Sequence, residues 1–75
     1  MSLRVIVKPE QISRWIAEHN GTPVRHGDAF RIAFEPTSEQ TLTVDELLDE
    51  MKFHHLVMLV DQEPGKTFHK IYAHS

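Results

Sequence analysis

The chain of 75 residues contains no cysteine. Disulfide bonds and thiolate zinc sites are therefore excluded, although both commonly supplement the core of a small protein. At this length folding buries only about 60% of the surface of the unfolded chain, so stability must come from close packing, from a metal held by histidine or from self-association. The lack of cysteine also fits a reducing compartment, and we expect a cytoplasmic protein.

The sequence also lacks long apolar runs and clustered positive charge. No segment approaches the roughly 18 consecutive apolar residues of a membrane span, and residues 3–7 are too short a run for a secretion signal. Eight Lys and Arg residues stand against eleven Asp and Glu, for a formal net charge of −3, and no two basic residues are adjacent. Because binding to a phosphate backbone depends on clustered cations, this pattern disfavours nucleic acid as a partner.

Catalytic motifs are missing as well. The three glycines are isolated, so the chain has no phosphate-binding loop. The serines occur without the glycine-rich elbow of a nucleophilic serine. We therefore predict no catalytic residue and no bound cofactor, and expect a protein that is not an enzyme.

What the sequence does contain is a clear pair of helix signals. In the segment Leu42–Met51, Thr43 and Glu46 have the spacing of a capping box. The apolar residues that follow have helical spacing. They are Val44, Leu47, Leu48 and Met51.

An earlier helix is indicated by Pro9, which suits a first helical position, and by a stop at Asn20 and Gly21. Its buried stripe is predicted to be Ile12, Trp15 and Ile16, so the single tryptophan is interpreted as a core residue.

Five strands are predicted around these helices. Residues 3–8 alternate, residues 24–34 form a hairpin, residues 56–60 are continuously apolar, and residues 67–73 alternate again. The expected fold class is α+β, a small single domain over residues 1–75 with the order β-α-β-β-α-β-β. We expect an antiparallel or mixed sheet with two helices packed on one face.

The register of the first hairpin is predicted from its apolar residues. If Val24 shares a face with Phe30, the two residues lie directly opposite each other across a three-residue loop at 26–28. A two-residue loop would instead place Arg31 opposite Val24.

The apolar run Leu56–Val60 indicates an inner strand that is covered on both faces. A chain this short does not cover both faces of a sheet by itself, so we expect a homodimer or another protein partner on the second face. Val57, Leu59 and Tyr72 are the predicted residues of that interaction surface.

Six histidines are the one compositional excess, and they leave a second hypothesis open. If residues 63–66 form the last turn, His55 lies opposite His74, and a carboxylate could complete a metal site. No HExxH motif is present. The primary interpretation is therefore no metal site, with His55 and His74 as the candidates for the alternative, a small histidine-metal protein or metalloenzyme. The full set is His19, His26, His54, His55, His69 and His74.

Short motifs resemble a family of small bacterial proteins of unassigned function, with the pattern RW-x-E-x-x-G-x-P, then LRI-x-F, then F-x-K. The resemblance covers residues 11–71, but this chain has Val44 where the family has tryptophan and Val60 where it has tyrosine. The family has no assigned catalytic residue, so the resemblance implies only a fold of this kind. The matching residues are Arg14, Trp15, Glu18, Gly21, Pro23, Arg31, Ile32, Phe34, Phe68 and Lys70.

The function is not fixed by these patterns. We interpret the protein as a small non-enzymatic binding or protein-interaction module, with the histidine-metal protein as the alternative.

Overall fold

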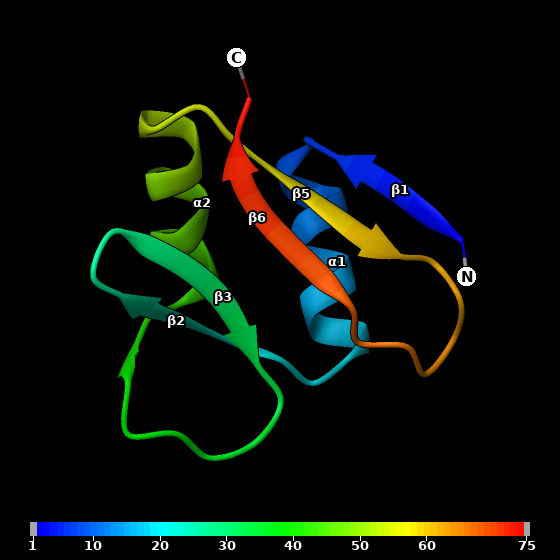
Figure 1. Cartoon of the computed structure of the whole chain (residues 1–75), viewed down its shortest axis with the longest axis horizontal. Coiled ribbons are helices and arrows are strands. Elements are labelled where there is room, and N and C mark those ends of the chain that lie inside the picture. The colour runs from blue at the N-terminus through cyan, green and yellow to red at the C-terminus, as the bar shows by residue number, and fades with distance from the viewer. Residues whose placement is uncertain (1, 75) are drawn as a thin grey trace.

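A computed structural model describes residues 2–74 and has an α+β fold of eight elements (Figure 1). The predicted fold class is confirmed. One short strand, β4, was not predicted, so the order is β-α-β-β-β-α-β-β. The elements are β1 (Leu3–Ile6), α1 (Pro9–Glu18), β2 (Thr22–His26), β3 (Ala29–Ala33), β4 (Gln40–Thr41), α2 (Val44–Phe53), β5 (Leu56–Asp61) and β6 (His69–Ala73).

The strands form two antiparallel sheets, with the orders β1-β5-β6 and β3-β2-β4, where a single sheet was expected. The sheets meet where β3 lies beside β6 (Figure 1). There the backbone N–H of Ile32 donates to Nε2 of His69 at 2.9 Å. A side chain of β6 thus replaces a backbone acceptor, which is why the two sheets meet without a continuous ladder.

The His69 ring is fixed by two partners of opposite kind. Its Nδ1 lies 3.0 Å from the carbonyl oxygen of Thr67, which can only accept, so Nδ1 carries the proton. Nε2 is then the acceptor for Ile32. The rings of Trp15 and Phe34 lie 5.8 and 5.6 Å from the His69 ring, between centroids, so the junction is an aromatic cluster.

Both helices begin as the sequence predicts, and α1 ends at its predicted stop, while α2 continues to Phe53, two residues beyond the predicted segment. Thr43 Oγ1 accepts from the N–H of Glu46 at 3.1 Å, and the Glu46 carboxylate accepts from the N–H of Thr43 at 2.9 Å. This is the predicted capping box. After α1, Asn20 adopts the left-handed conformation with a φ of 54°. Gly21 is needed for a different reason, because a Cβ there would collide with the side chain of Ile32.

The core lies between the helices and the sheets. Leu47 of α2 and Met58 of β5 are both 0% exposed, and Trp15 is 7% exposed, which confirms its predicted place. The core cluster comprises Ile6, Ile12, Trp15, Ile16, Phe30, Ile32, Leu47, Met51, Met58 and Val60.

The predicted register of the first hairpin is wrong. Val24 pairs with Arg31 and Arg25 with Phe30, which leaves Gly27 and Asp28 as a two-residue turn. The φ of 61° at Gly27 fits the first position of a type II′ turn. The prediction assumed that Val24 needed the face of Phe30 for burial. Val24 is 0% exposed on the opposite face, between its pairing partners Arg31 of β3 and Thr41 of β4.

The predicted position and register of Leu56–Val60 are confirmed. β5 is the central strand of its sheet, and Leu56 pairs with Ala73, as a turn at 63–66 requires. Neither helix of the described chain has the length and apolar character that crossing a membrane requires.

Candidate functional site

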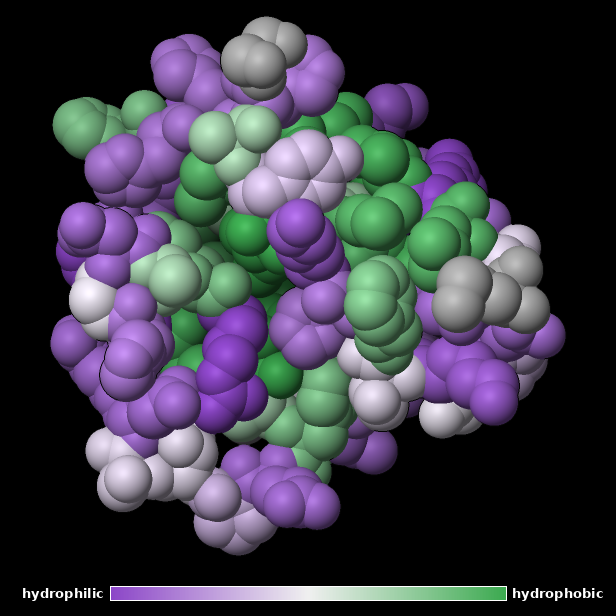
Figure 2. Space-filling view, viewed as in Figure 1, coloured by the Kyte–Doolittle hydropathy of each residue, from purple (hydrophilic) through white to green (hydrophobic). Residues whose placement is uncertain are grey.

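The sheet β1-β5-β6 has an apolar face turned away from the helices. We call it the outer face, and Figure 2 shows apolar surface gathered over these three strands. The pairings of Val5 with Leu59 and of Val57 with Tyr72 place side chains from all three strands on it. The apolar and aromatic residues of the outer face are Leu3, Val5, Val57, Leu59, Phe68 and Tyr72.

Strand β1 contributes two of the most exposed residues of this face. Leu3 and Val5 are 43% and 46% exposed, whereas Ile6, which points to the core, is 5% exposed. Arg4 shares the inner side with Ile6. The usual pattern of apolar inside and polar outside is therefore inverted at residues 3–5, and burial within one copy of the chain does not explain it.

Strand β1 is also an open edge, because it pairs only with β5. The N–H of Gln62 donates to the carbonyl of Ser2 at 2.7 Å, so alternate residues of β1 direct their backbone groups toward β5. These are Arg4 and Ile6. Leu3 and Val5 direct their N–H and C=O groups to the unpaired side, where another strand can bind.

Asp61 lies beside Leu3, at the border of the outer face. It is 4% exposed, and its Oδ1 accepts from the N–H of Glu63 at 3.0 Å and from that of Ser2 at 3.3 Å. The Glu63 hydrogen bond is the main cause that lowers the pKa of the Asp61 carboxyl, and it outweighs the opposing effect of burial. The carboxylate thus fastens the start of β1 and the turn after β5 to each other.

The three residues predicted for an interaction surface all lie on this face. Val57 is 6% exposed, while Leu59 and Tyr72 are half-buried. Sequence reasoning missed the more exposed Leu3, Val5 and Phe68. The alternation of residues 3–8 was visible, but the sequence did not show which side of that strand faces the helices.

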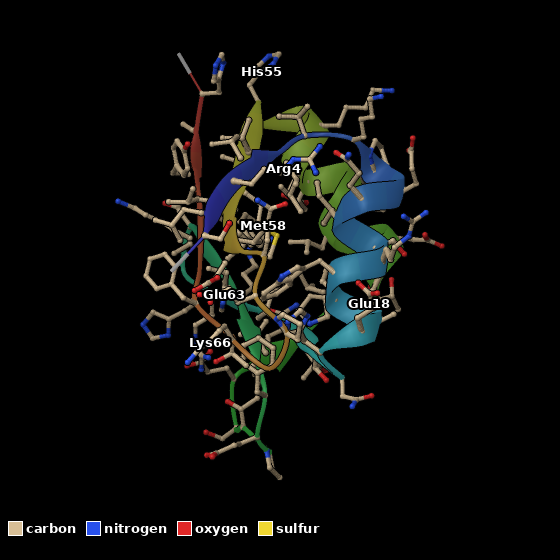
Figure 3. The ribbon with its side chains drawn as sticks, turned by 90° about the vertical axis from the view of Figure 1, so that its right-hand side faces the viewer. Arg4, Glu18, His55, Met58, Glu63 and Lys66 are labelled. Atoms are coloured by element: carbon tan, nitrogen blue, oxygen red, sulfur yellow. The ribbon has the colours of Figure 1, made fainter. Side chains whose placement is uncertain are left out.

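The two histidines of the metal hypothesis lie opposite each other, as their register required. The N–H of His74 donates to the carbonyl of His55 at 2.9 Å. Both side chains are exposed, and Figure 3 places His55 at one end of the molecule, far from Glu63 and Lys66. Within residues 2–74, no group of three or more His, Cys, Asp or Glu side chains is placed to hold a metal ion.

Comparison with known proteins found no relative of this chain. No protein-family model matches the chain, and neither the curated proteins nor the solved structures contain a match to it.

Proposed function

We propose that this protein is a non-enzymatic interaction module that binds a second copy of itself through the open edge of β1. The observation that carries the proposal is that Leu3 and Val5 expose both their side chains and their backbone groups. Their side chains lie 43% and 46% exposed on the outer face, and their backbone groups point to the open edge.

A second copy satisfies such an edge because a two-fold axis makes the contact self-complementary. Two β1 strands that pair antiparallel each offer the donors and acceptors that the other needs. The two sheets then join into one sheet of six strands, and their outer faces become continuous.

Charge favours one register for this pairing. If Leu3 lay opposite Val5 of the second copy, the two Arg4 side chains would face each other, and like charges directly opposite are unfavourable. If Val5 lies opposite Val5, Arg4 faces Ile6 instead. We therefore propose a pairing centred on Val5.

A standard interface buries about 800 Å² on each partner, which is roughly one sixth of the 5200 Å² surface of this chain. The outer face lies on the broad side of a molecule measuring 32 × 29 × 18 Å (Figures 1 and 2).

The test is sedimentation or light scattering from about 1 to 100 µM, where a weak dimer changes its apparent mass with concentration. Val5→Lys places a charge on the edge and is expected to leave a monomer at all concentrations. Phe53→Lys is the matched control, because Phe53 is 72% exposed on α2, outside the outer face. A wild-type chain that stays monomeric at about 100 µM contradicts the proposal, as does a dimer that Val5→Lys leaves intact.

A further inference from the structure

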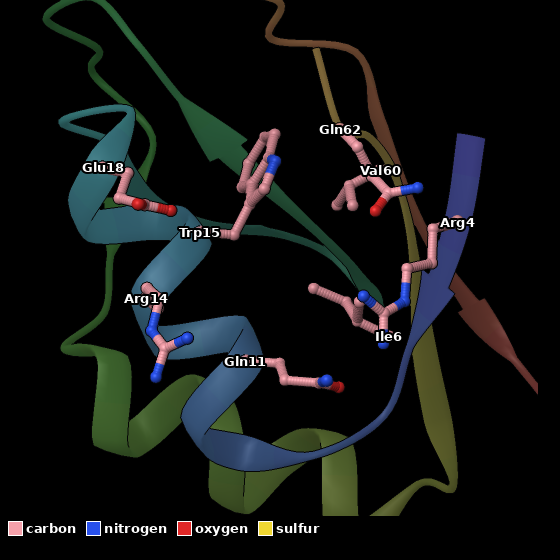
Figure 4. A pocket seen from close by; sticks show the side chains of 8 residues that line it. All are labelled: Arg4, Ile6, Gln11, Arg14, Trp15, Glu18, Val60 and Gln62. Carbon is pink, nitrogen blue, oxygen red and sulfur yellow. The ribbon is translucent and has the colours of Figure 1, made fainter. Parts of the chain in front are cut away.

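A pocket of about 220 Å³ lies between α1 and the strands β1 and β5 (Figure 4). Ile6, Trp15 and Val60 supply its apolar wall. Its polar lining consists of Arg4, Gln11, Arg14, Glu18 and Gln62.

The two arginines of this pocket have no partner among residues 2–74. The ion pairs within residues 2–74 join Arg31 to Glu39 and His54 to Glu50. Neither Arg4 nor Arg14 forms an ion pair or a side-chain hydrogen bond within that range. Each therefore retains its guanidinium donors for another group.

Arg4 is an exposed residue on the inner side of β1. The inversion of β1 puts apolar Leu3 and Val5 on the outside and turns Arg4 toward α1. Figure 4 shows the Arg4 side chain reaching from β1 toward the helix, with the carboxamides of Gln11 and Gln62 directed into the same space. Two arginines against one glutamate also leave the pocket positive on a chain whose net charge is −3.

We propose that this pocket binds a small organic anion. Its oxyanion group, a carboxylate or a phosphate, is held by Arg4, because a guanidinium matches both groups with paired donors. Arg14 lies on α1 across the pocket and adds positive charge to its lining. Gln11 and Gln62 add amide donors. A short apolar or aromatic body lies against Trp15, Ile6 and Val60. The volume equals that of about seven water molecules at roughly 30 Å³ each, which fits a ligand the size of benzoate.

This site borders the proposed dimer contact. The pocket opens on the inner side of β1, and the contact uses the edge of this strand, but Val5 does not line the pocket. Anion binding is therefore expected to persist in Val5→Lys, so failure of one proposal is distinguishable from failure of the other.

The probes are benzoate, phenyl phosphate and inorganic phosphate, titrated against the full chain. Trp15 is the single tryptophan and lines the pocket, so its fluorescence reports occupancy. We expect a saturable change with the organic anions, and weaker binding of inorganic phosphate, which has no apolar body. The stronger of benzoate and phenyl phosphate identifies the oxyanion.

Arg4→Gln is expected to raise the dissociation constant at least about tenfold, since it removes charge-assisted hydrogen bonds. Arg14→Gln, at an exposed helix position, removes charge from the pocket lining and is expected to weaken binding by a smaller factor. Arg25→Gln is the matched control, because Arg25 lies 5.5 Å from the Phe30 ring, away from this pocket. No saturable change with any probe up to about 10 mM, a weak-binding limit, overturns the proposal. Equal affinities of the Arg4, Arg14 and Arg25 variants also overturn it.

Discussion

The two faces of the sheet β1-β5-β6 are both largely apolar, with Lys70 on the outer one, but only the inner face is covered. On the inner face Ile6, Met58 and Val60 are 5%, 0% and 2% exposed. On the outer face Leu3, Val5 and Phe68 are 43%, 46% and 50% exposed. Burial in a single copy of the chain explains the inner residues and leaves the outer ones unexplained. The comparison teaches that apolar character alone does not identify a core, and that the uncovered face needs a reason outside the monomer.

The two faces are expected to differ most in the loss of stability when neighbouring residues of β5 are substituted. Met58→Ala removes a fully buried side chain and is expected to cost about 2–5 kcal/mol of the free energy of unfolding. Leu59→Ala, on the half-buried outer face, is expected to cost less. Urea denaturation at low protein concentration measures both values. Equal losses would show that the outer face is as well packed as the inner one.

The packing of the inner face can also be tested at the polar residue His69. His69→Ala leaves the N–H of Ile32 without its acceptor, which is expected to cost about 1–3 kcal/mol. His69→Gln retains an acceptor on a side chain of similar reach, so it is expected to recover part of the loss. Amide hydrogen exchange at Ile32 is the direct readout. Unchanged exchange in His69→Ala would show that this hydrogen bond does not join the sheets.

A smaller, pH-dependent effect is expected from Asp61 at the border of the outer face. The hydrogen bond from Glu63 lowers the pKa of this carboxyl in the folded state. The resulting stabilisation is present above the pKa of the unfolded chain, about 3.9, and is lost as the pH falls through the lower folded value. Asp61→Asn should therefore flatten the decline of the melting temperature between about pH 5 and pH 2. A decline as steep as that of the wild type would assign acid sensitivity to other carboxyl groups.

The smallest effect on the monomer is expected from Phe68→Gln. Phe68 is 50% exposed, so the substitution is expected to change the free energy of unfolding by no more than about 0.5 kcal/mol at low protein concentration. At about 100 µM it should leave the apparent mass unchanged, because β5 lies between Phe68 and the β1 edge. A large loss of monomer stability would place Phe68 in the core rather than on the exposed surface.

The sequence predicted those features that local chemistry determines. Thr43 and Glu46 are three residues apart, so their capping box is visible in the sequence, and Asn20 beside Gly21 marks a helix end. The β5–β6 register also follows from a short turn. The division into two sheets does not, because the bond between His69 and Ile32 joins residues 37 positions apart. Nothing in the local sequence separates this histidine from the other five.

The candidate site was predicted only in part, for a related reason. Val57, Leu59 and Tyr72 were recognisable because they lie on an unusually apolar strand and its neighbour. The side of β1 that faces the helices depends on the path from Ile6 into α1, which three-dimensional packing decides. The pocket around Arg4 and Trp15 was therefore not predicted, since its lining combines residues from both ends of the chain.

The position of β1 also bears on how the molecule opens. This strand pairs with one neighbour only, and its pairing of Leu3 with Asp61 joins two residues that lie far apart in the chain. It can therefore detach while α2 and the β5–β6 hairpin remain folded, as a local opening of low free energy. Detachment would leave one side of β5 without its partner strand. A released β1 could then occupy the same place in a neighbouring molecule, which makes exchange of this segment between copies a route to larger assemblies.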